Sequence, residues 1–405
     1  MAAFKKAIEQ YEGNHPNVKV QLELVSADNL IPYYATNLAG GNTPDIGVTW
    51  DSLTIEYVTK DYALPLDDIV NDMGGIDEFV KYSLFNKDGH IYNMPYAGGG
   101  PVLWIRKDLF EKYNIKIPET WDEWLDAAKK LTLDTNNDGS IDIYGTTIAA
   151  GKNNMTEAIL FVLIWQTGHT AFDADMKPTF NNEGTIKALQ FLKNLAKYCP
   201  PGIGEYSYYE MIDALSSKRV ASTIYWGRVL GHLKDNAPDL LDKIQAVPLP
   251  TDKIKVTYSS HDDYLVFKNS KYPEIAKDFL KFIVTGDRMA DFLLTVPGHL
   301  LPVTKANTKL ESFWNDPFVK QQKKNIEVLF EVPNYGISMA NEAGAKIVNG
   351  KFVPLEGMFN SVYAKVEAQY IVPQAVQKVI IQGMSPEDTA KWGQAEMERI
   401  ISELK

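Results

Sequence analysis

The length, composition and charge of the chain limit the kind of protein it can be. Its 405 residues exceed what one hydrophobic core usually supports, so we expect two domains. With 45% hydrophobic and 23% charged residues, the composition is that of a folded soluble protein. The chain has 41 Lys and Arg against 52 Asp and Glu, a net charge of −11. Nucleic acid and anionic membranes bind through surplus basic side chains, so a neutral ligand is the better expectation.

A single cysteine and the lack of a long apolar run restrict the architecture further. Cys199 cannot form an internal disulfide, and one thiol cannot build a structural zinc site. No apolar run approaches the roughly 18 residues that span a bilayer, so no membrane-spanning helix is predicted. A helical pattern begins at Phe4 without a signal peptide. We therefore expect either a cytoplasmic protein or one whose leader has been removed.

The first fifty residues alternate between helical and strand patterns. Apolar residues recur at helical spacing over residues 4–11. Apolar and polar residues alternate over residues 18–24, which predicts a half-buried strand. Residues 43–50 are predicted to be a turn followed by a short buried strand. Asp51 then stands at the end of that strand, where ligands bind in open α/β sheets.

The middle of the chain continues this alternation. Residues 91–106 are predicted to form a strand, a glycine-rich loop and a second strand, and residues 107–113 a helix. A further helix over residues 121–131 begins with a capping box formed by Thr120 and Glu123. Helices and strands alternate to about residue 285, and roughly the last 90 residues have mainly helical patterns, which indicates an α/β fold.

Common catalytic motifs are absent from the sequence. It has no Gly-x-Gly-x-x-Gly, no Gly-x-Ser-x-Gly and no His-Glu-x-x-His, and residues 145–152 lack the spacing of a phosphate-binding loop. Asp262 and Asp263 are a candidate glycosidase pair, but neighbours on a strand point to opposite faces and would not flank one bond. We expect one of these carboxylates to point inward and the other to be solvated.

Residues 134–145 begin like a calcium-binding loop. Oxygen-bearing side chains alternate along the segment, and Gly139 occupies the sixth position, where such loops turn. The twelfth position, which should supply a bidentate Glu, is Gly145. Two alternatives remain, a weak calcium site and a plain Asx and glycine turn. The candidate ligands are Asp134, Asn136, Asp138, Ser140 and Asp142.

Aromatic residues are frequent near predicted strand ends and loops. The chain has eight Trp and 21 Tyr. Aromatic faces pack against the apolar faces of sugar rings, while Asp, Asn and Arg exchange hydrogen bonds with hydroxyl groups. Packing in the core is the alternative for each of them. The residues concerned are Trp50, Tyr96, Trp104, Trp165, Tyr225 and Trp226.

Short segments with a shared order and spacing extend over nearly the whole chain. They are Gly41-Asn-Thr-Pro-Asp45, Met94-Pro-Tyr96, Lys107-Asp-Leu-Phe-Glu-Lys112, Ile117-Pro-Glu-Thr-Trp-Asp-Glu-Trp-Leu-Asp-Ala-Ala-Lys-Lys-Leu-Thr132, Tyr144-Gly145, Leu163-Ile-Trp-Gln-Thr-Gly168, Ser217-Lys-Arg-Val-Ala221, Val247-Pro-Leu-Pro250, Phe267-Lys-Asn-Ser-Lys271, Ala276-Lys-Asp-Phe-Leu-Lys-Phe-Ile283 and Leu301-Pro-Val303. Through these segments the chain resembles the family 1 bacterial extracellular solute-binding proteins, the maltose-binding-like receptors of ABC sugar importers.

The resemblance implies an α/β fold of the periplasmic-binding-protein type II, with two lobes, a hinge and a ligand cleft between the lobes. On that pattern lobe one comprises residues 1–107 and 268–310, and lobe two comprises residues 108–267 and 311–405. Ligand would close the hinge by contacting both lobes, and the permease would recognise the closed form. Relatives begin with a strand before the first helix, and we expect this N-terminal strand to be missing from lobe one.

The resemblance also implies which residues contact the ligand. Arg228 stands where many relatives have an aromatic residue, which would suit a smaller ligand or a carboxylate. His261 and Asp262 replace a small or aromatic pair and make the site more polar. The full set is Trp50, Asp51, Tyr96, Gly98, Gly99, Trp165, Tyr225, Trp226, Arg228, His261 and Asp262.

The expected function is that of the substrate-binding protein of an ABC importer, which binds a mono- or oligosaccharide and is not an enzyme. One alternative is the same fold with a non-sugar ligand, namely an acidic sugar derivative, a polyol phosphate or a peptide. A glycoside-active enzyme is the other. We expect a monomer without a cofactor whose partners are a carbohydrate and the ABC permease. The expected location is periplasmic or extracellular and membrane-anchored, with the leader absent from this sequence.

Overall fold

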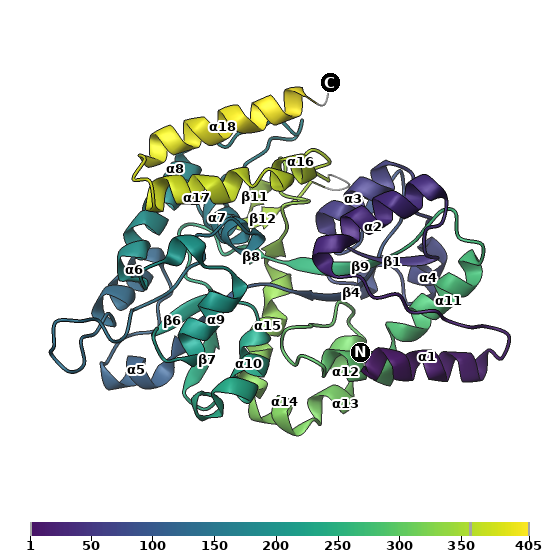
Figure 1. The fold of residues 1–405 in the computed structure, drawn as a ribbon, viewed down its shortest axis with the longest axis horizontal. Coiled ribbons are helices and arrows are strands. Elements are labelled where there is room, and N and C mark those ends of the chain that lie inside the picture. The colour runs from purple at the N-terminus through teal and green to yellow at the C-terminus, as the bar shows by residue number, and fades with distance from the viewer. Residues whose placement is uncertain (1, 356–358, 404–405) are drawn as a thin grey trace. The chain divides into compact units, whose positions relative to one another are not determined.

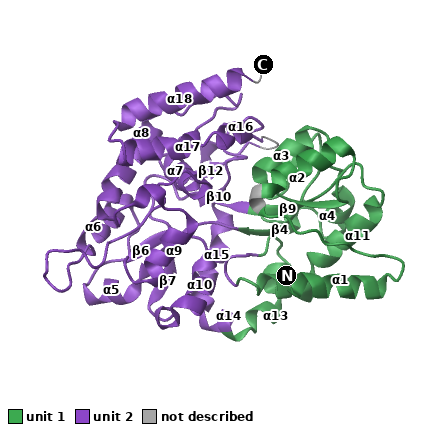
Figure 2. Cartoon of the chain, viewed as in Figure 1, with its two compact units in different colours: residues 1–98, 261–296, 302–317 green, residues 99–260, 297–301, 318–405 purple. Residues whose placement is uncertain are grey.

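The chain is divided between two structural units, each of which collects segments far apart in the sequence (Figures 1 and 2). Residues 2–355 and 359–403 are described by this computed structural model. Unit 1 comprises residues 1–98, 261–296 and 302–317. Unit 2 comprises residues 99–260, 297–301 and 318–405. None of the described helices combines the length and the hydropathy needed to span a bilayer.

Unit 1 is built on a sheet whose described strands have the order β1-β9-β4. β1 runs antiparallel to β9, with a register from Ile46 opposite Val266 to Trp50 opposite Asp262. Its strands are β1 (Ile46–Trp50), β2 (Asn86–Lys87), β3 (His90–Ile91), β4 (Met94–Gly99) and β9 (Ser260–Val266). Its helices are α1 (Ala2–Asn14), α2 (Ala27–Gly40), α3 (Asp51–Thr59), α4 (Asp67–Asp72), η1 (Ile76–Glu78), α11 (Pro273–Ile283), α12 (Gly286–Leu293), η5 (Asn307–Lys309) and α13 (Glu311–Trp314).

Helix α1 covers the core of unit 1 with the apolar face that its periodicity predicts. Ala7, Ile8 and Tyr11 are buried in a cluster that also includes Met94 of β4 and Phe279 of α11. The Tyr11 hydroxyl donates a hydrogen bond to Asp278 at 2.7 Å. The helix predicted over residues 4–11 is therefore confirmed, with longer ends.

The strand predicted over residues 18–24 is wrong. Val18, Val20 and Leu22 do pack against the unit 1 core, as the alternation indicates. The segment nevertheless pairs with no described strand, because β1 bonds to β9 alone in this sheet, and the Val20 N–H donates to the Glu12 carboxylate at 2.9 Å. Alternation reports a half-buried segment, but a strand also needs a hydrogen-bonded neighbour.

Unit 2 contains a sheet whose described strands have the order β6-β5-β7, with both pairs antiparallel. Its strands are β5 (Val102–Arg106), β6 (Ser222–Tyr225), β7 (Ile244–Val247), β8 (Thr257–Tyr258), β10 (Gly336–Ile337), β11 (Lys346–Val348) and β12 (Lys351–Val353). The first helices are α5 (Lys107–Lys112), α6 (Trp121–Lys130), α7 (Asn154–Gln166), α8 (Glu183–Leu195), η2 (Ala196–Tyr198), η3 (Ile203–Glu205), α9 (Tyr208–Ser216), α10 (Arg228–Asn236) and η4 (Pro238–Leu240). The later helices are α14 (Pro317–Gln321), α15 (Lys323–Glu331), η6 (Val332–Asn334), α16 (Tyr363–Ala368), α17 (Ile371–Ile380) and α18 (Pro386–Ser402).

Helix α7 lies at the centre of unit 2 and is buried on every side from Met155 to Gln166. α8 and α17 pack against it, and α18 packs against both α8 and α17 (Figure 1). A helix that is apolar all round is stable only when neighbours cover it completely, so the C-terminal helices are part of this core. The predicted capping box of α6 is present: Thr120 accepts from the Glu123 N–H, and Glu123 accepts from the Thr120 N–H.

The unit boundaries differ from those that the family resemblance implies. The chain is expected to pass from one lobe to the other near residues 107, 267 and 310. In the structure it passes between the units after residues 98, 260 and 317, and residues 297–301 also belong to unit 2. Strand pairing explains the first two shifts. β5 bonds to β6 and β7 and so belongs to unit 2, whereas β9 bonds to β1 and so belongs to unit 1.

Candidate functional site

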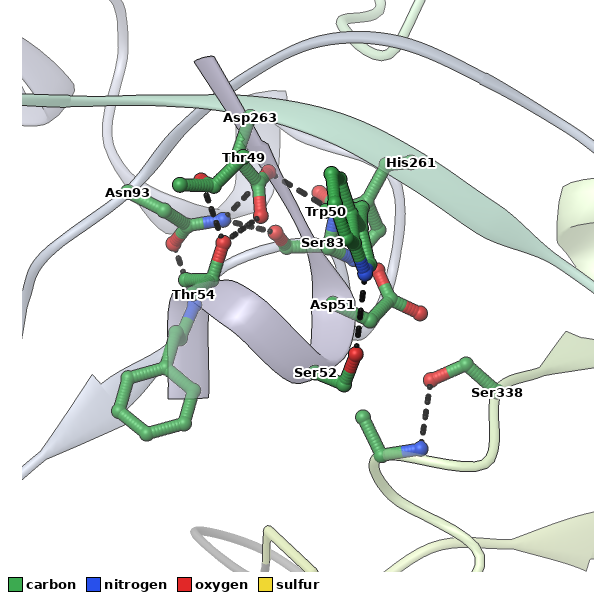
Figure 3. A network of polar contacts seen from close by, with 12 residues as sticks. Thr49, Trp50, Asp51, Ser52, Thr54, Ser83, Asn93, His261, Asp263 and Ser338 are labelled. Atoms are coloured by element: carbon green, nitrogen blue, oxygen red, sulfur yellow. Dashed lines mark hydrogen bonds and ion pairs between the residues drawn. The ribbon is translucent and has the colours of Figure 1, made fainter. Parts of the chain in front are cut away.

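A buried polar network lies in unit 1 where β1 ends and β9 begins (Figure 3). The antiparallel register places Thr49 opposite Asp263 and Trp50 opposite Asp262. Asp51 follows Trp50 as the first residue of α3, and His261 precedes Asp262 on β9. Two predicted ligand residues from each strand end are therefore brought together, although they are about 210 positions apart in sequence.

Asp263 is the centre of the network and has no exposed surface. Its carboxylate accepts hydrogen bonds from the Thr54 hydroxyl and the Asn93 amide, both at 2.8 Å. The Asn93 side chain is itself held, because it donates to the Ser83 carbonyl at 2.8 Å and accepts from the Phe85 N–H at 2.6 Å. Buried polar groups with all their partners in place are rigid, so the Asp263 carboxylate has a fixed orientation.

His261 lies between two carboxylates. Its Nδ1 atom is 2.9 Å from Asp263 Oδ1 and 3.3 Å from Asp51 Oδ1, and its side chain is 14% exposed. Burial alone lowers the pKa of a histidine, but the attraction of Asp51 and Asp263 outweighs it and raises the pKa of His261 to about 10. The imidazole is therefore a cation at neutral pH.

Asp262 points away from this network and reaches solvent. The surrounding protein, together with the charges of Asp263 and Asp51, raises the pKa of Asp262 to about 6. The expectation that one of the two adjacent carboxylates is buried and the other solvated is confirmed. They lie on opposite faces of β9 and cannot act as a glycosidase pair on one bond.

The ligating atoms of Asp51, His261 and Asp263 lie within 4.8 Å of one another, a spacing at which a metal ion can be held. In this structure His261 Nδ1 is directed at the Asp263 carboxylate, which already accepts from Thr54 and Asn93. The arrangement is that of an ion triad, with a cation held between two anions.

The aromatic residues of unit 1 have different degrees of access. Trp50 is half-buried, and its indole N–H donates to Ser52 Oγ at 3.0 Å. Tyr96 stacks on Tyr264 with ring centroids 4.3 Å apart. A cavity of ≈ 20 Å³ next to these two rings has room for about one water molecule, so it is too small for a sugar.

Unit 2 carries a second group of predicted residues, at the end of β6. Trp226 has its ring centroid 6.1 Å from that of Tyr258 and 6.5 Å from that of the exposed Tyr208. Its carbonyl and that of Tyr225 accept from the Trp104 indole N–H at 3.2 and 3.1 Å. The next residue must be glycine, because a Cβ on Gly227 would lie 1.8 Å from the Gly298 carbonyl oxygen. This turn presents Arg228 to solvent at the start of α10.

Two predicted ligand residues are core residues instead. Trp165 has no exposed surface, and its indole N–H donates to the buried Glu342 at 3.2 Å. Tyr225 is 2% exposed, and its hydroxyl donates to the Tyr208 carbonyl at 3.0 Å. Both predictions are corrected here, since a side chain packed on all sides offers no face to a ligand. Trp104 is likewise fully buried.

The predicted glycine-rich loop is shorter than expected. Gly98 and Gly99 belong to β4, so they are strand residues and not part of a flexible loop, and their contact with a ligand stays a prediction. Gly100 is the position that requires glycine, because a Cβ there would lie 1.9 Å from the Tyr258 carbonyl oxygen.

The candidate calcium loop is an exposed turn in unit 2. Its side chains satisfy the backbone of the loop: Asp134 accepts from the Gly139 N–H at 2.9 Å, and Asp138 accepts from the Ser140 N–H at 2.8 Å. Asp142 accepts from the Thr135 N–H at 2.7 Å. These bonds are those of an Asx turn. Calcium binding by Asp134, Asn136, Asp138, Ser140 and Asp142 stays a prediction.

The sequence did not indicate that Thr54 and Asn93 belong to the site, or that Asp263 is the carboxylate that points inward. Asp263 could have been placed by strand alternation, since it shares a face of β9 with His261. Asn93 and Thr54 gave no signal, because their partners are about 170 and 209 positions away in sequence and only the fold brings them together.

Comparisons with known proteins identify the family. The profile of the bacterial extracellular solute-binding proteins matches residues 1–287, and the chain belongs to this family. A binding protein of Brucella abortus is 28% identical over 320 residues, which cover 77% of this chain and 75% of that protein. The arabinooligosaccharide-binding protein of Halalkalibacterium halodurans is 26% identical over 317 residues, covering 71% and 66% of the two chains.

The solved structures agree with the family at the level of the fold. An ABC transporter solute-binding protein from Thermotoga lettingae, bound with α-D-tagatose, superposes with a TM-score of 0.78 at 20% identity and covers 98% of this chain and 95% of that one. The family resemblance and the type II binding-protein fold that the sequence indicates are therefore confirmed. The family is that of extracellular or periplasmic solute-binding proteins of ABC transporters.

Proposed function

We propose that this chain is the substrate-binding subunit of an ABC importer and that its ligand is a neutral mono- or oligosaccharide. The observation that carries the proposal is the ion pair of Asp51 and His261 in unit 1, which lies next in sequence to the half-buried Trp50 and the exposed Asp262. A sugar hydroxyl can accept a hydrogen bond from an imidazolium and donate one to a carboxylate, while an indole face packs against the ring. Relatives that bind tagatose and arabino-oligosaccharides support a carbohydrate ligand.

The exposed Arg228 of unit 2 is the feature that would suit an acidic ligand. In unit 1 the three carboxylates of Asp51, Asp262 and Asp263 outnumber the one imidazolium of His261, so this region repels an anionic ligand and favours a neutral one. We therefore retain a neutral sugar as the ligand. We further propose a non-enzymatic, monomeric protein that delivers its ligand to the permease and is held outside the cytoplasm by a membrane anchor, and the family supports the role in transport.

Thermal unfolding in the presence of candidate ligands tests this function. A ligand that binds only the folded state stabilises it by about 2.7 kcal/mol at a concentration 100 times its dissociation constant. We expect D-tagatose or arabino-oligosaccharides to raise the melting temperature, and Asp51→Asn to abolish the shift. Asp77→Asn, on the exposed part of η1, is the matched control. A shift produced by uronic acids and sugar phosphates, with none from neutral sugars, would contradict the proposal.

A further inference from the structure

The protonation state of His261 is built into the fold of unit 1. Asp263 has no exposed surface, and its oxygens are engaged by Thr54, Asn93 and His261. Asn93 is fixed in turn by two backbone groups, those of Ser83 and Phe85. A carboxylate held in this way accepts from Nδ1–H of the imidazole and determines how the ring is oriented.

The second imidazole nitrogen of His261 has a different environment. Nδ1 faces Asp263 at 2.9 Å and Asp51 at 3.3 Å. Across the described ranges, 2–355 and 359–403, Nε2 makes no hydrogen bond, and 14% of the side chain remains exposed. An imidazolium has an N–H on each nitrogen, so Nε2–H is a charged donor available to a ligand.

We propose that Asp263 is a positioning residue that keeps His261 as an imidazolium, and that the Nε2–H of His261 is a ligand donor that selects hydroxylated neutral ligands over anionic ones. This inference rests on the proposed function for its ligand and deepens it. Asp263 touches no ligand and acts only through His261.

The charges around this donor determine the selection. Asp51, Asp262 and Asp263 carry three negative charges when ionised and His261 carries one positive charge, so the sum is 1 − 3 = −2. A ligand carboxylate or phosphate would be attracted by the His261 imidazolium, but the net negative charge of the four side chains would repel it. A hydroxyl group accepts from Nε2–H and adds no negative charge to these carboxylates, so it gains the hydrogen bond without the repulsion.

Ligand-free NMR of the imidazole nitrogens tests the positioning step. In the full-length protein we expect the His261 signals, assigned by their loss in His261→Gln, to show both nitrogens protonated up to about pH 9. In Asp263→Asn the ring should become neutral by about pH 8. Asp262→Asn, the exposed neighbour on the same strand, should leave the ring charged at pH 8.

If Asp263→Asn fails to fold, Thr54→Val removes one donor to Asp263 and should still lower the pH at which His261 loses its proton. A neutral His261 at pH 8 in the unaltered protein would overturn the inference.

Ligand binding tests the selection step. With D-galactose and D-galacturonate as probes, we expect the neutral sugar to bind at least tenfold more tightly. Its affinity should be constant from pH 7 to pH 9 in the unaltered protein. In Asp263→Asn it should fall over the same range, a pH profile that a purely structural role would not produce. Tighter binding of the uronate would overturn the inference. If D-galactose, D-tagatose and arabino-oligosaccharides all fail to bind while His261 stays charged, the proposed function fails and the positioning role of Asp263 stands.

Discussion

Glu342 shows at the scale of one residue how burial changes the dependence of stability on pH. The side chain is fully buried in unit 2 and accepts from the Trp165 indole N–H at 3.2 Å and the Ala171 N–H at 3.0 Å. Burial raises the pKa of Glu342 to about 8. A glutamate in the unfolded chain has a pKa of about 4.3. The folded state thus binds an extra proton between these values, and stability falls as the pH rises from about 4.3 to 8.

Replacing Glu342 with Gln removes this penalty and keeps an oxygen for both donors. We expect Glu342→Gln to be more stable than the unaltered protein at pH 9 and to differ little from it at pH 5, measured by urea denaturation at both pH values. Glu387→Gln on the exposed first turn of α18 is the control and should show no such difference. An equal loss of stability at both pH values would indicate that Glu342 is ionised in the folded protein.

Individual site residues were only partly predictable, and burial explains which ones. Trp50 is the last residue of a short strand whose end the sequence marks, Asp51 follows it, and both lie at the network of unit 1. Trp165 has the same residue type as Trp50, yet it lies on a helix that is apolar on every side and packs in the core. Residue type cannot distinguish these two cases. The periodicity of residues 154–166, which is not amphipathic, was the available signal for burial.

Close packing between elements depends on a few glycines, and Gly145 is the clearest case. A Cβ at this position would lie 1.8 Å from the carbonyl oxygen of Ala128, on helix α6. We expect Gly145→Ala to lower the free energy of unfolding by more than about 2 kcal/mol, because two backbones must separate. Gly13→Ala is the matched control: nothing lies within 4 Å of its Cβ, and replacing a helical glycine should stabilise by about 0.5–1 kcal/mol. Chemical denaturation of both variants measures the two effects, and equal stabilities would contradict the close approach.

Elements that carry a local signal were predicted well. The capping box of Thr120 and Glu123 and the periodicity of α1 require no information from outside the segment. The segment over residues 18–24 carries an equally clear alternation, but strand formation depends on a partner that its own sequence does not specify. Gly98 and Gly99 likewise lie within a strand because β9 is beside them.

At the scale of the whole molecule, the order of short family segments indicated the fold class, but it did not locate the boundaries between the units. Those boundaries depend on the partners of β5 and β9, two strands that begin within a few residues of a boundary between the units. Neither unit is a continuous stretch of chain. Residues 318–405 belong entirely to unit 2, whereas every segment of unit 1 ends by residue 317.

This division predicts the effect of removing residues 318–405. Unit 2 would lose α17, which packs on α7, and α18, which packs on α8. It would also lose Asn325, whose side chain accepts from the Ala246 N–H on β7 at 2.9 Å, and Gly393, which contacts the Phe180 ring closely. Because α7 is buried on all sides and mostly apolar, we expect it to lose its stable fold when one face is uncovered.

Hydrogen exchange measured by mass spectrometry can follow the two units separately in the shortened chain. We expect peptides from residues 155–195 to lose most of their protection, while peptides from residues 46–98 and 261–283 retain theirs, since all strands of the unit 1 sheet and its helix α11 remain. The full-length chain under the same conditions is the reference. Retained protection in α7 and α8 would show that the C-terminal helices are not needed to cover the core of unit 2. Lost protection in β1 and β9 would show that unit 1 does not keep its fold without residues 318–405.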